Sequence, residues 1–595
     1  MKWFLGIIDL KEQSLNLDEL HRYRSLETSC NASVEHDEII NNNSAFFISS
    51  VSDLYTNTRI IQVDNYYIVG DIRIDNRKDI INRYSIAEKY TECDEAIFLY
   101  LYKNLGESFI EQIIGEFSFV LWDQDNLELF CARDQLGTKT LFWLKENDVV
   151  YIASDLHVIG NKIDLSNLNN NYFNEYYVSD GCVDTTSTPY KNVFRLPSAS
   201  WLMMNDKKVN VTNYWNIIEN KKEIKYKKME QYEEHFLEIM GEAVRSRMTS
   251  EDKNAVWMSG GLDSPTIFAL AKQFESCEIT PISSVYDEHR ESDEREYIEP
   301  ILQMYSTQGV FQNCDNEIFL RDFSDQSSWS FEPHVNSFTH AILDKMLWNT
   351  SHIVKAKNLF TGFGGDHVLD GTELVIADQL KRGKIINSVK NAYQYSYRTQ
   401  ESFLRVLWFF GIVPNLNRGY DQKQLLRPMR DNFNKDVRYA RLFSQKEFIK
   451  QLSGITAHLY CDRIVARKYG IAVQTPFLDK RFIEFIYSTP GNIRWQGGIY
   501  KRILRQAMEG KLPEKVLWNL NKIGSISTIY KGLNENWPIL YQVIEKCRIA
   551  EFGLITRSEW KNLMNNWKQG KLVRDDIYVL LSLEIWLYKL ERLVS

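Results

Sequence analysis

Long hydrophobic runs are missing from this 595-residue sequence. No stretch approaches the ~18 uncharged apolar residues that a membrane-spanning helix needs. The apolar run from Trp3 to Ile8 ends at Asp9 and is too short for a secretory signal. We therefore expect a cytoplasmic protein without a membrane span.

An excess of basic residues is also missing. The formal net charge is -8 and the isoelectric point is near 5.8, which argues against a surface built to neutralise nucleic-acid phosphates. Hydrophobic residues make up 44% and charged residues 25%, as in ordinary globular proteins. At ~100 to 200 residues per domain, this length allows about two to four domains.

Cysteine is sparse, and no two cysteines form a CxxC pair, which disfavours a structural zinc site. We expect reduced, mostly buried thiols. The eight cysteines are Cys30, Cys93, Cys131, Cys182, Cys277, Cys314, Cys461 and Cys547.

Two kinds of sequence pattern divide the chain. Short alternating or apolar runs such as 117–122, broken by Asp, Asn and Gly, are typical of a β-rich domain. The charged stretch at 218–228 has few core-forming side chains, and helical spacings dominate beyond it. We predict a first domain at residues 1–215, a linker at 216–228 and a second domain at 229–595.

The string SGGLDS at residues 259–264 follows a short apolar run and precedes a helical pattern. At a strand-to-helix turn, its two glycines allow backbone N–H groups to approach an anion closely, and its two serine hydroxyls add donors. The spacing differs from GxxxxGK[ST] because no lysine follows the glycines. A polyphosphate is the expected ligand, and a tight Gly-Gly turn capped by Asp and Ser is the structural alternative.

SGGLDS resembles the PP-loop of the ATP pyrophosphatases, and a resemblance to the asparagine synthetase superfamily extends over nearly the whole chain. In that family the loop holds the β and γ phosphates of ATP, and a carboxylate attacks the α phosphate to give an acyl-adenylate and pyrophosphate. The resemblance therefore implies an AMP-forming carbon–nitrogen ligase. It assigns ATP binding to Trp257, Ser259, Gly260, Gly261, Asp263, Ser264, Ser284 and Gly362.

A second glycine-rich string, GFGGD at residues 362–366, resembles the G-x-G-[GS]-D segment of the same family. In the family its aspartate shares magnesium with the loop aspartate. The resemblance thus implies that Asp263 and Asp366 bind Mg²⁺, a hard cation that prefers oxygen ligands. A strand followed by a glycine turn is the alternative interpretation.

Two later segments resemble the family in part. PFLD at 476–479 matches, although GIAVQ at 470–474 replaces the family's Gly-Leu-Glu-x-Arg, and a packing corner is an equal alternative. KRILRQA at 501–507 resembles K-x-x-L-R-x-A, and the turn that follows places the catalytic lysine at Lys522. A cation there would offset negative charge at the α phosphate, whereas a solvated surface lysine is the alternative.

The first domain is similar to the glutaminase domain of asparagine synthetases at 114–123, 132–139 and 152–155. This similarity implies an αββα sandwich of the Ntn-hydrolase type, whose nucleophile is an amino-terminal cysteine. Here the second residue is Lys2 and the first cysteine is Cys30. We expect a degenerate glutaminase domain without glutamine hydrolysis, joined to a PP-loop α/β domain with helical additions.

Superfamily members that lost this cysteine include β-lactam and carbapenam synthetases and lasso peptide cyclases, which join an amine and a carboxylate within one molecule. Phe363 stands where the β-lactam type carries the tyrosine of a Tyr-Glu base pair, and a phenyl ring cannot take a proton. The segment ADQLKRGK at residues 377–384 resembles the corresponding segment of lasso peptide cyclases. Ring closure is therefore the leading reaction.

The leading hypothesis is ATP-dependent macrolactam formation in a ribosomal precursor peptide, with an Asp or Glu carboxylate adenylated and then attacked by the amino terminus. The resemblance implies ATP and Mg²⁺ as cofactors, and a leader peptidase and a peptide-recognition protein as partners. One alternative is an ammonia-dependent or small-molecule amide ligase. Another is a non-catalytic ATP-binding homologue.

Overall fold

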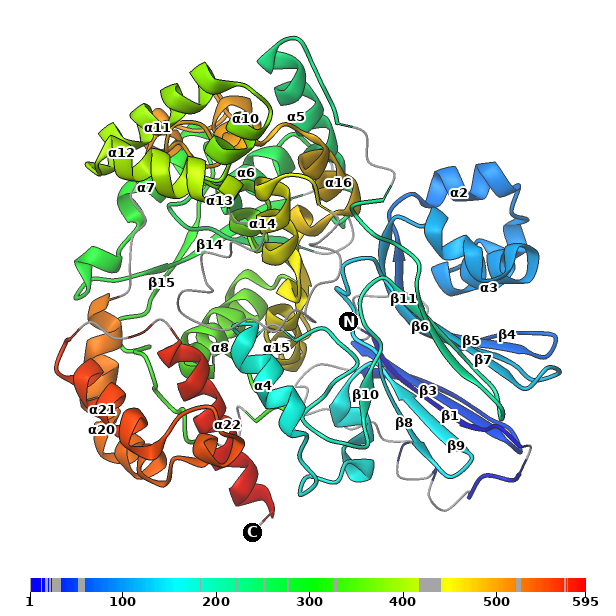
Figure 1. Ribbon diagram of the computed structural model, residues 1–595. Helices are drawn as coiled ribbons and strands as arrows, with labels where there is room; N and C mark the ends of the chain where they lie inside the picture. The colour runs from blue at the N-terminus through cyan, green and yellow to red at the C-terminus, as the bar shows by residue number, and fades with distance from the viewer. Residues whose placement is uncertain are drawn as a thin grey trace.

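The computed structural model contains two domains, one built on two antiparallel sheets and the other on a parallel sheet with helices (Figure 1). The mixed α/β fold class predicted from the sequence is confirmed. The structure describes residues 2–11, 13–16, 20, 23, 34–51, 59–181, 183–219, 223–249, 253–274, 278–325, 329–335, 337–416, 440–520, 526–571, 574 and 576–594.

The N-terminal domain stacks two six-stranded antiparallel sheets. Their strand orders are β10-β8-β9-β1-β3-β2 and β12-β11-β7-β6-β5-β4. The strands are β1 Lys2–Asp9, β2 Val34–Ile40, β3 Ser44–Val51, β4 Ile61–Val63, β5 Tyr66–Ile74, β6 Gly115–Asp123, β7 Glu128–Arg133, β8 Phe142–Glu146, β9 Val149–Ala153, β10 Phe194–Arg195, β11 Ser200–Met204 and β12 Val209–Asn213.

Successive side chains of β1 point alternately into two layers of the hydrophobic core. Phe4 and Ile8 pack between the two sheets, whereas Trp3 and Ile7 belong to the hydrophobic cluster on the opposite face. Successive side chains of a strand point to opposite faces, so a strand buried on both sides is apolar throughout. Helices cover the outer faces: α2 (Arg77–Tyr84) and α3 (Asp94–Leu105) on the second sheet, and α4 (Asn170–Val178) on the first. The predicted αββα sandwich is thus confirmed.

The C-terminal domain is built around a five-stranded parallel sheet with the order β15-β14-β13-β16-β17. Helices pack on both of its faces, because Val256 and Ala255, adjacent on β13, belong to different hydrophobic clusters. The strands are β13 Asn254–Trp257, β14 Ile279–Val285, β15 Val310–Asn313, β16 Asn358–Phe360 and β17 Ala472–Gln474. The helices are α5 Met229–Arg245, α6 Asp263–Ala271, α7 Arg295–Met304, α8 His340–Asn349, α9 Gly365–Leu369, α14 Phe443–Leu452, α15 Ile455–Lys468, α16 Lys480–Ser488, α17 Gly491–Arg494, α18 Arg502–Ala507 and α19 Glu514–Leu517.

Three C-terminal helices return to the N-terminal domain. They are α20 Ile526–Lys546, α21 Arg557–Lys568 and α22 Ile577–Val594. Their apolar side chains share one hydrophobic cluster with β1 and α4, and Tyr176 Oη lies 3.0 Å from Ser582 Oγ within it. The core therefore continues across the domain boundary. The predicted linker, 216–228, lies between the end of β12 and the start of α5.

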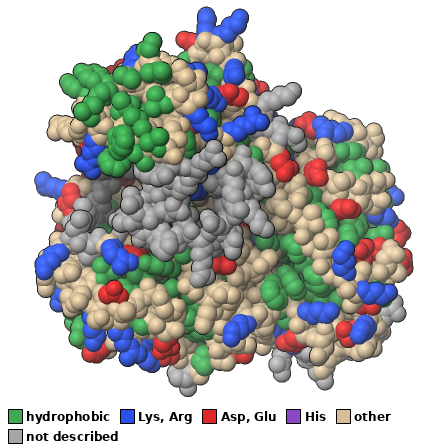
Figure 2. Space-filling model, viewed as in Figure 1, with side chains coloured by type: hydrophobic (Ala, Val, Ile, Leu, Met, Phe, Trp, Pro, Cys, Tyr) green, Lys and Arg blue, Asp and Glu red, His purple; other side chains and the backbone are tan. Residues whose placement is uncertain are grey.

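A helical extension lies at the outer end of the C-terminal domain, in light green in Figure 1. It consists of α10 Val375–Lys381, α11 Ile385–Thr399, α12 Phe403–Val406, the π-helix η9 Leu407–Ile412 and α13 Val413–Leu416. Hydrophobic side chains gather on its outer surface (Figure 2). Among the residues that the structure describes, no helix has the length and apolar character needed to cross a membrane.

Candidate active site

The two glycine-rich strings meet at the carboxyl edge of the parallel sheet. One follows β13 and the other follows β16, and these strands are neighbours in the sheet. The chain runs from β13 to β14 and β15 on one side and then returns to β16 on the other. The loops after β13 and β16 therefore flank a topological switch point, where ligands bind in open parallel sheets.

Hydrogen bonds within the first loop fix its turn. The N–H of Ser259 donates to Ser264 Oγ at 3.0 Å, and the two serine hydroxyls lie 3.1 Å apart. The N–H of Gly261 donates to Ser259 Oγ at 3.3 Å. Since α6 begins at Asp263, the positive end of its dipole lies at this turn. The loop therefore presents the donors and the field that an anionic ligand requires.

Gly362 and Gly365 allow the second loop to lie directly against the first. A Cβ atom at Gly362 would be 2.9 Å from the backbone N of Ser264, and one at Gly365 would be 2.3 Å from Cγ of Asp263. Neither position can accept a side chain unless Asp263 or the first loop moves. Gly362, assigned to ATP by the family resemblance, thus acts at least in part by permitting this approach.

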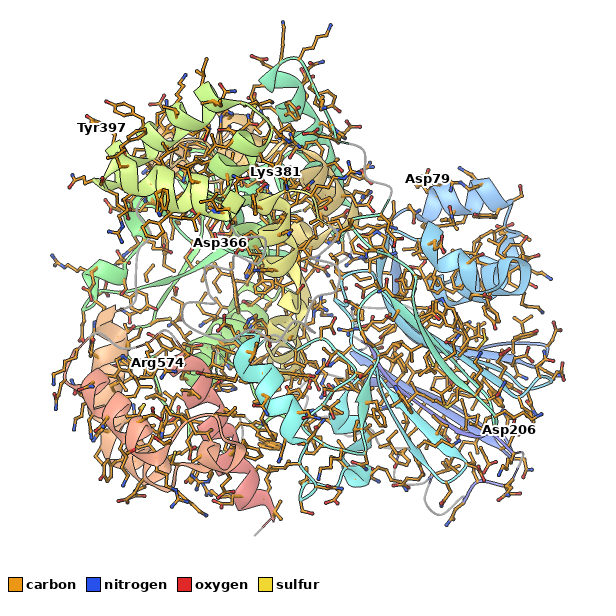
Figure 3. All side chains as sticks on the ribbon, in the orientation of Figure 1. Asp79, Asp206, Asp366, Lys381, Tyr397 and Arg574 are labelled. Atoms are coloured by element: carbon orange, nitrogen blue, oxygen red, sulfur yellow. The ribbon has the colours of Figure 1, made fainter. Side chains whose placement is uncertain are left out.

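Lys501 joins the two aspartates predicted to bind metal. Its Nζ donates to Asp263 Oδ2 at 2.6 Å and also to Asp366 Oδ1, and it lies 3.7 Å from Asp370 Oδ1. Asp366 lies near the middle of the view in Figure 3, and its side chain is partly exposed. The structure brings Asp263 and Asp366 together, and it adds a cation to which the sequence pattern assigned no role. The available signal was the position of Lys501 at the start of the K-x-x-L-R-x-A string.

The charges around Lys501 stabilise its ammonium form. Burial by itself lowers the pKa of Lys501, but the carboxylates of Asp263, Asp366 and Asp370 outweigh burial and raise it. In the same site, burial raises the pKa of Glu294, and a bond from the N–H of Gly260 to Glu294 Oε2, at 3.1 Å, opposes the rise. One backbone N–H of the loop at residues 259–264 therefore already donates to a carboxylate.

The donor set fits a magnesium ion bound together with a nucleotide. Within the described parts of the chain, no group of three or more His, Cys, Asp and Glu residues could hold a metal ion. Mg²⁺ commonly uses one or two protein carboxylates and takes its other oxygens from phosphates and water. Asp263 and Asp366 could supply those two carboxylates from adjacent loops, and the phosphates would supply the rest.

Two predicted ATP-binding residues occupy the strands beside the first loop. Trp257 Nε1 donates to Thr350 Oγ1 at 3.2 Å, and its indole packs against the hydrophobic cluster under α8. Ser284 lies near the carboxyl end of β14, the neighbour of β13. Trp257 therefore has a structural contact of its own in addition to its predicted role.

The predicted catalytic residue, Lys522, lies outside the described residues. The segment that leads to it is held by Arg505, a buried side chain of α18. Its guanidinium donates to the carbonyl oxygens of Leu517 and Asn519, the latter at 3.2 Å, and to that of Tyr500 at 2.9 Å. Arg505 thus connects the backbone beside Lys501 with the chain that precedes Lys522.

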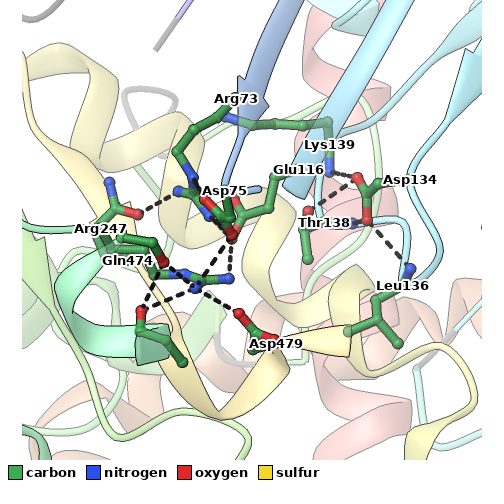
Figure 4. A network of polar contacts seen from close by, with 12 residues as sticks. Arg73, Asp75, Glu116, Asp134, Leu136, Thr138, Lys139, Arg247, Gln474 and Asp479 are labelled. Carbon is green, nitrogen blue, oxygen red and sulfur yellow. Dashed lines mark hydrogen bonds and ion pairs between the residues drawn. The ribbon is translucent and has the colours of Figure 1, made fainter. Parts of the chain in front are cut away.

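The PFLD string contributes to the domain interface, where buried ion pairs form a network (Figure 4). Arg247 Nη1 donates to Asp479 at 3.0 Å, and its guanidinium lies 3.4 Å from Glu116 of β6. Arg463 lies 3.4 Å from the same glutamate. Burial opposes ionisation of Glu116, but the arginines Arg73, Arg247 and Arg463 outweigh it and lower its pKa. Asp479 also caps α16, which supports the packing alternative for this string.

Lys2, at the start of β1, forms a buried ion pair. Lys2 Nζ donates to Glu95 Oε1 at 2.5 Å, and both side chains are buried. Burial lowers the pKa of Lys2, but Glu95 and Asp71 outweigh it and raise that pKa. The cavity beside Lys2 measures about 20 Å³, which is room for about one water molecule.

Phe363 is the residue that the family resemblance aligns with the tyrosine of the β-lactam type. The centroids of the Phe363 and His367 rings lie 5.9 Å apart.

Two protein-family models match the chain. The model described as "Asparagine synthase" matches residues 235–588, more than half of the chain, and the model described as "Glutamine amidotransferase domain" matches residues 60–215. These matches correspond to the parallel-sheet domain and to most of the two-sheet domain.

Curated relatives show the same similarity at low identity. A putative asparagine synthetase of Methanocaldococcus jannaschii is 25% identical over 326 residues, which is 53% of this chain and 61% of that protein. Asparagine synthetase 3 of Bacillus subtilis is 22% identical over 76% of this chain and 74% of its own length. The Gibberella zeae protein named Amidase chry2 is 25% identical over 82% of this chain and 81% of its own length. The chain belongs to the asparagine synthase family.

Proposed function

We propose that this protein closes a macrolactam ring in a ribosomal precursor peptide, as an ATP-dependent ligase. ATP-dependent amide formation is the activity of its family. The finer proposal depends chiefly on one observation, the buried ion pair between Lys2 and Glu95. β1 carries no cysteine, serine or threonine, and an ammonium paired with a carboxylate is no nucleophile. The amine would therefore come from the substrate.

Two thiols in the described part of this domain, those of Cys93 and Cys131, support the same proposal. Cys93 lies close to Glu95, and burial together with that carboxylate raises the pKa of its thiol to about 11. Burial also raises the pKa of Cys131. A thiol must ionise to act as a nucleophile, so neither is activated. We propose that the domain hydrolyses no glutamine and serves to hold the ligase domain.

The proposed reaction has two steps. A side-chain carboxylate of the peptide attacks the α phosphorus of ATP, an acyl–phosphate bond forms, and pyrophosphate leaves. The amino-terminal nitrogen of the same peptide then attacks the acyl carbon, loses a proton, and AMP leaves. Asp263 and Asp366 would hold Mg²⁺, which offsets phosphate charge when bound. Lys501 and the loop N–H groups would orient the phosphates.

The string ADQLKRGK supports a peptide substrate through its resemblance to lasso peptide cyclases. A reaction of this kind requires the precursor peptide, a leader peptidase and a peptide-recognition protein as partners.

The competing proposal is an ammonia-dependent or small-molecule amide ligase, which is favoured by the asparagine synthetases among the relatives. A non-catalytic ATP-binding homologue is opposed by the assembled Lys501, Asp263 and Asp366 cluster.

One experiment separates these proposals. Purified protein is incubated with Mg²⁺ and ATP in three arms: synthetic peptides with a free amino terminus and one Asp or Glu at successive positions, aspartate with ammonium, and aspartate with glutamine. We expect AMP, pyrophosphate and loss of one water in mass only with peptides, and no glutamate released from glutamine. AMP formed with aspartate and ammonium, and with no peptide, would establish the competing ligase. Binding of Mg-ATP in calorimetry, with no AMP formed in any arm, would instead indicate the non-catalytic ATP-binding homologue.

A further inference from the structure

Helix α11 of the helical extension exposes large apolar side chains, while its buried side mixes Ala392 and Tyr395 with polar residues. Ile386 is 84% exposed and Tyr397 is 78% exposed. On the inner face, Ser388 Oγ donates to the carbonyl oxygen of Ile376 at 2.9 Å, and Asn391 Nδ2 donates to Gln379 Oε1 at 3.0 Å. A helix that packs on a globular core normally buries its apolar side. The large apolar side chains left exposed on the outer side of α11 indicate that another surface covers this side.

The apolar surface continues from α11 onto α12, η9 and α13. Leu404 is 74% exposed, and Trp408 and Phe409 are exposed beside it. Figure 2 shows hydrophobic side chains gathered over the helical extension. We call this area the α11–α13 face. Its members are Ile385, Ile386, Val389, Tyr393, Tyr397, Leu404, Trp408, Phe409 and Leu416. Contiguous apolar patches of this kind mark interaction sites, whereas single exposed hydrophobic residues do not.

The α11–α13 face is bordered by cations, in a chain whose net charge is -8. Residues 375–416 contain six basic side chains and two acidic ones, a balance of +4. One of the two acids, Asp378, is buried and accepts bonds from the N–H groups of Phe443 and Ser444. The basic residues are Lys381, Arg382, Lys384, Lys390, Arg398 and Arg405.

A basic cavity of about 650 Å³ opens at the edge of this face. The acidic residue that lines it, Glu223, is already paired with Arg382 at 2.7 Å and with Lys225 at 3.2 Å. Burial lowers the pKa of Arg502, and Glu233 offsets this only in part. An anion in the cavity would stabilise these cations. The cationic lining residues are Lys225, Lys227, Lys228, Arg382, Lys384 and Arg502.

We infer that the α11–α13 face docks onto an anionic membrane surface, with its apolar side chains in the boundary between headgroups and acyl chains and with lipid phosphates in the basic cavity. Tyr and Trp side chains favour that boundary, and a basic border favours anionic lipids. Figure 3 shows Tyr397 well apart from Asp366, so docking through Tyr397 would leave the active site accessible. The inference does not depend on the peptide substrate.

The test measures sedimentation of the full chain with vesicles of phosphatidylcholine alone or mixed with phosphatidylglycerol. We expect binding to the anionic vesicles only, weakened by salt. Ile386→Asp with Tyr397→Asp should abolish it, and Lys384→Glu with Lys390→Glu should weaken it at least about tenfold. These side chains lie on the surface, so the variants should fold. Ile353→Asp, an exposed aliphatic position outside the face, is the matched control.

Three outcomes would overturn the inference. The first is no binding to anionic vesicles, or equal binding by the Ile386→Asp, Tyr397→Asp variant. The second is a concentration-dependent dimer of the wild type that this variant loses in size-exclusion chromatography, which would make the face an interface between copies. The third is calorimetric binding of inorganic phosphate that blocks vesicle binding without any effect of the apolar substitutions.

Discussion

The absence of a side chain at Gly365 allows the two loops of the active site to lie in direct contact. A methyl group there would meet the Asp263 carboxylate, since Cβ would lie 2.3 Å from Cγ. We predict that Gly365→Ala displaces Asp263 and lowers ATP–pyrophosphate exchange about 100-fold, the size of effect expected for a 1 Å misplacement. Gly241→Ala in α5 is the control, because a Cβ there meets nothing within 4 Å. Unchanged exchange in Gly365→Ala would refute the close packing.

Lys501 and a divalent cation compete for the same pair of carboxylates. Lys501 Nζ bonds both Asp263 and Asp366, so a metal ion must displace it or share them. We predict that Lys501→Met binds Mn²⁺, a probe for Mg²⁺, about tenfold more tightly without nucleotide, which is about 1.4 kcal/mol. The same variant should lose pyrophosphate exchange. Paramagnetic resonance of free Mn²⁺ measures the affinity.

Lys515→Met is the matched control for Lys501→Met, because Lys515 makes an exposed ion pair with Glu296. An Mn²⁺ affinity that is the same in Lys501→Met and in the wild type would contradict competition at this position. The result does not depend on the identity of the substrate to be adenylated, so it tests the site separately from the proposed reaction.

At the scale of elements, three half-buried histidines, His334, His340 and His458, lie in the loop before α8, in α8 and in α15. Burial lowers the pKa of His334 to about 3 and of His340 and His458 to about 4. In the unfolded chain these side chains bind protons near pH 6.5. Between pH 6.5 and about 4 the unfolded state therefore binds more protons than the folded state, and stability falls as the pH falls.

We predict that the free energy of unfolding decreases by up to about 1.4 kcal/mol per pH unit for each of these histidines below pH 6.5. Urea unfolding at pH 7.5, 6.0 and 5.0 measures the slope. His458→Gln should flatten the slope, whereas His352→Gln, at an exposed position, serves as the control. Stability that is constant or rises over this range would show that the histidines are protonated in the folded state.

At the scale of the whole molecule, Arg247 links the two domains. Its guanidinium is 1% exposed and contacts Glu116 and Asp75 of one domain and Asp479 of the other. Removal of one partner from a buried charge network leaves uncompensated charges and costs about 3 to 5 kcal/mol. We predict that Arg247→Met lowers the unfolding temperature and separates the domain transitions in calorimetry.

Arg245→Met provides the comparison for Arg247→Met, two residues earlier on the chain. Arg245 pairs with Glu242 on the surface and is 62% exposed, so its loss should cost less than about 1 kcal/mol. A single cooperative transition in Arg247→Met at the wild-type temperature would show that the shared core of β1, α4 and α22 is sufficient to hold the domains together.

The sequence predicted much of the site because its residues lie in short continuous strings. SGGLDS and GFGGD each follow a strand, and parallel neighbouring strands bring their loops to one edge. The role of Lys501 was not predictable in this way. Its contacts join positions 131 or more residues apart in the chain, and only packing brings these side chains together. The exposed apolar face of α11 was also not predictable from the sequence, because helical spacing does not tell which side of a helix is buried.

Local sequence determined the α/β class, the phosphate-type loop, the paired aspartates and the loss of cysteine from the first strand. These features depend on residue type, spacing and backbone preference, which are properties of short segments. Tertiary structure alone decided that Lys501 lies between Asp263 and Asp366, that the C-terminal helices complete the N-terminal core, and that α11 leaves large apolar side chains exposed. Each of these features depends on which segments, far apart in the sequence, pack together and exclude water, and this is a property of the whole folded chain.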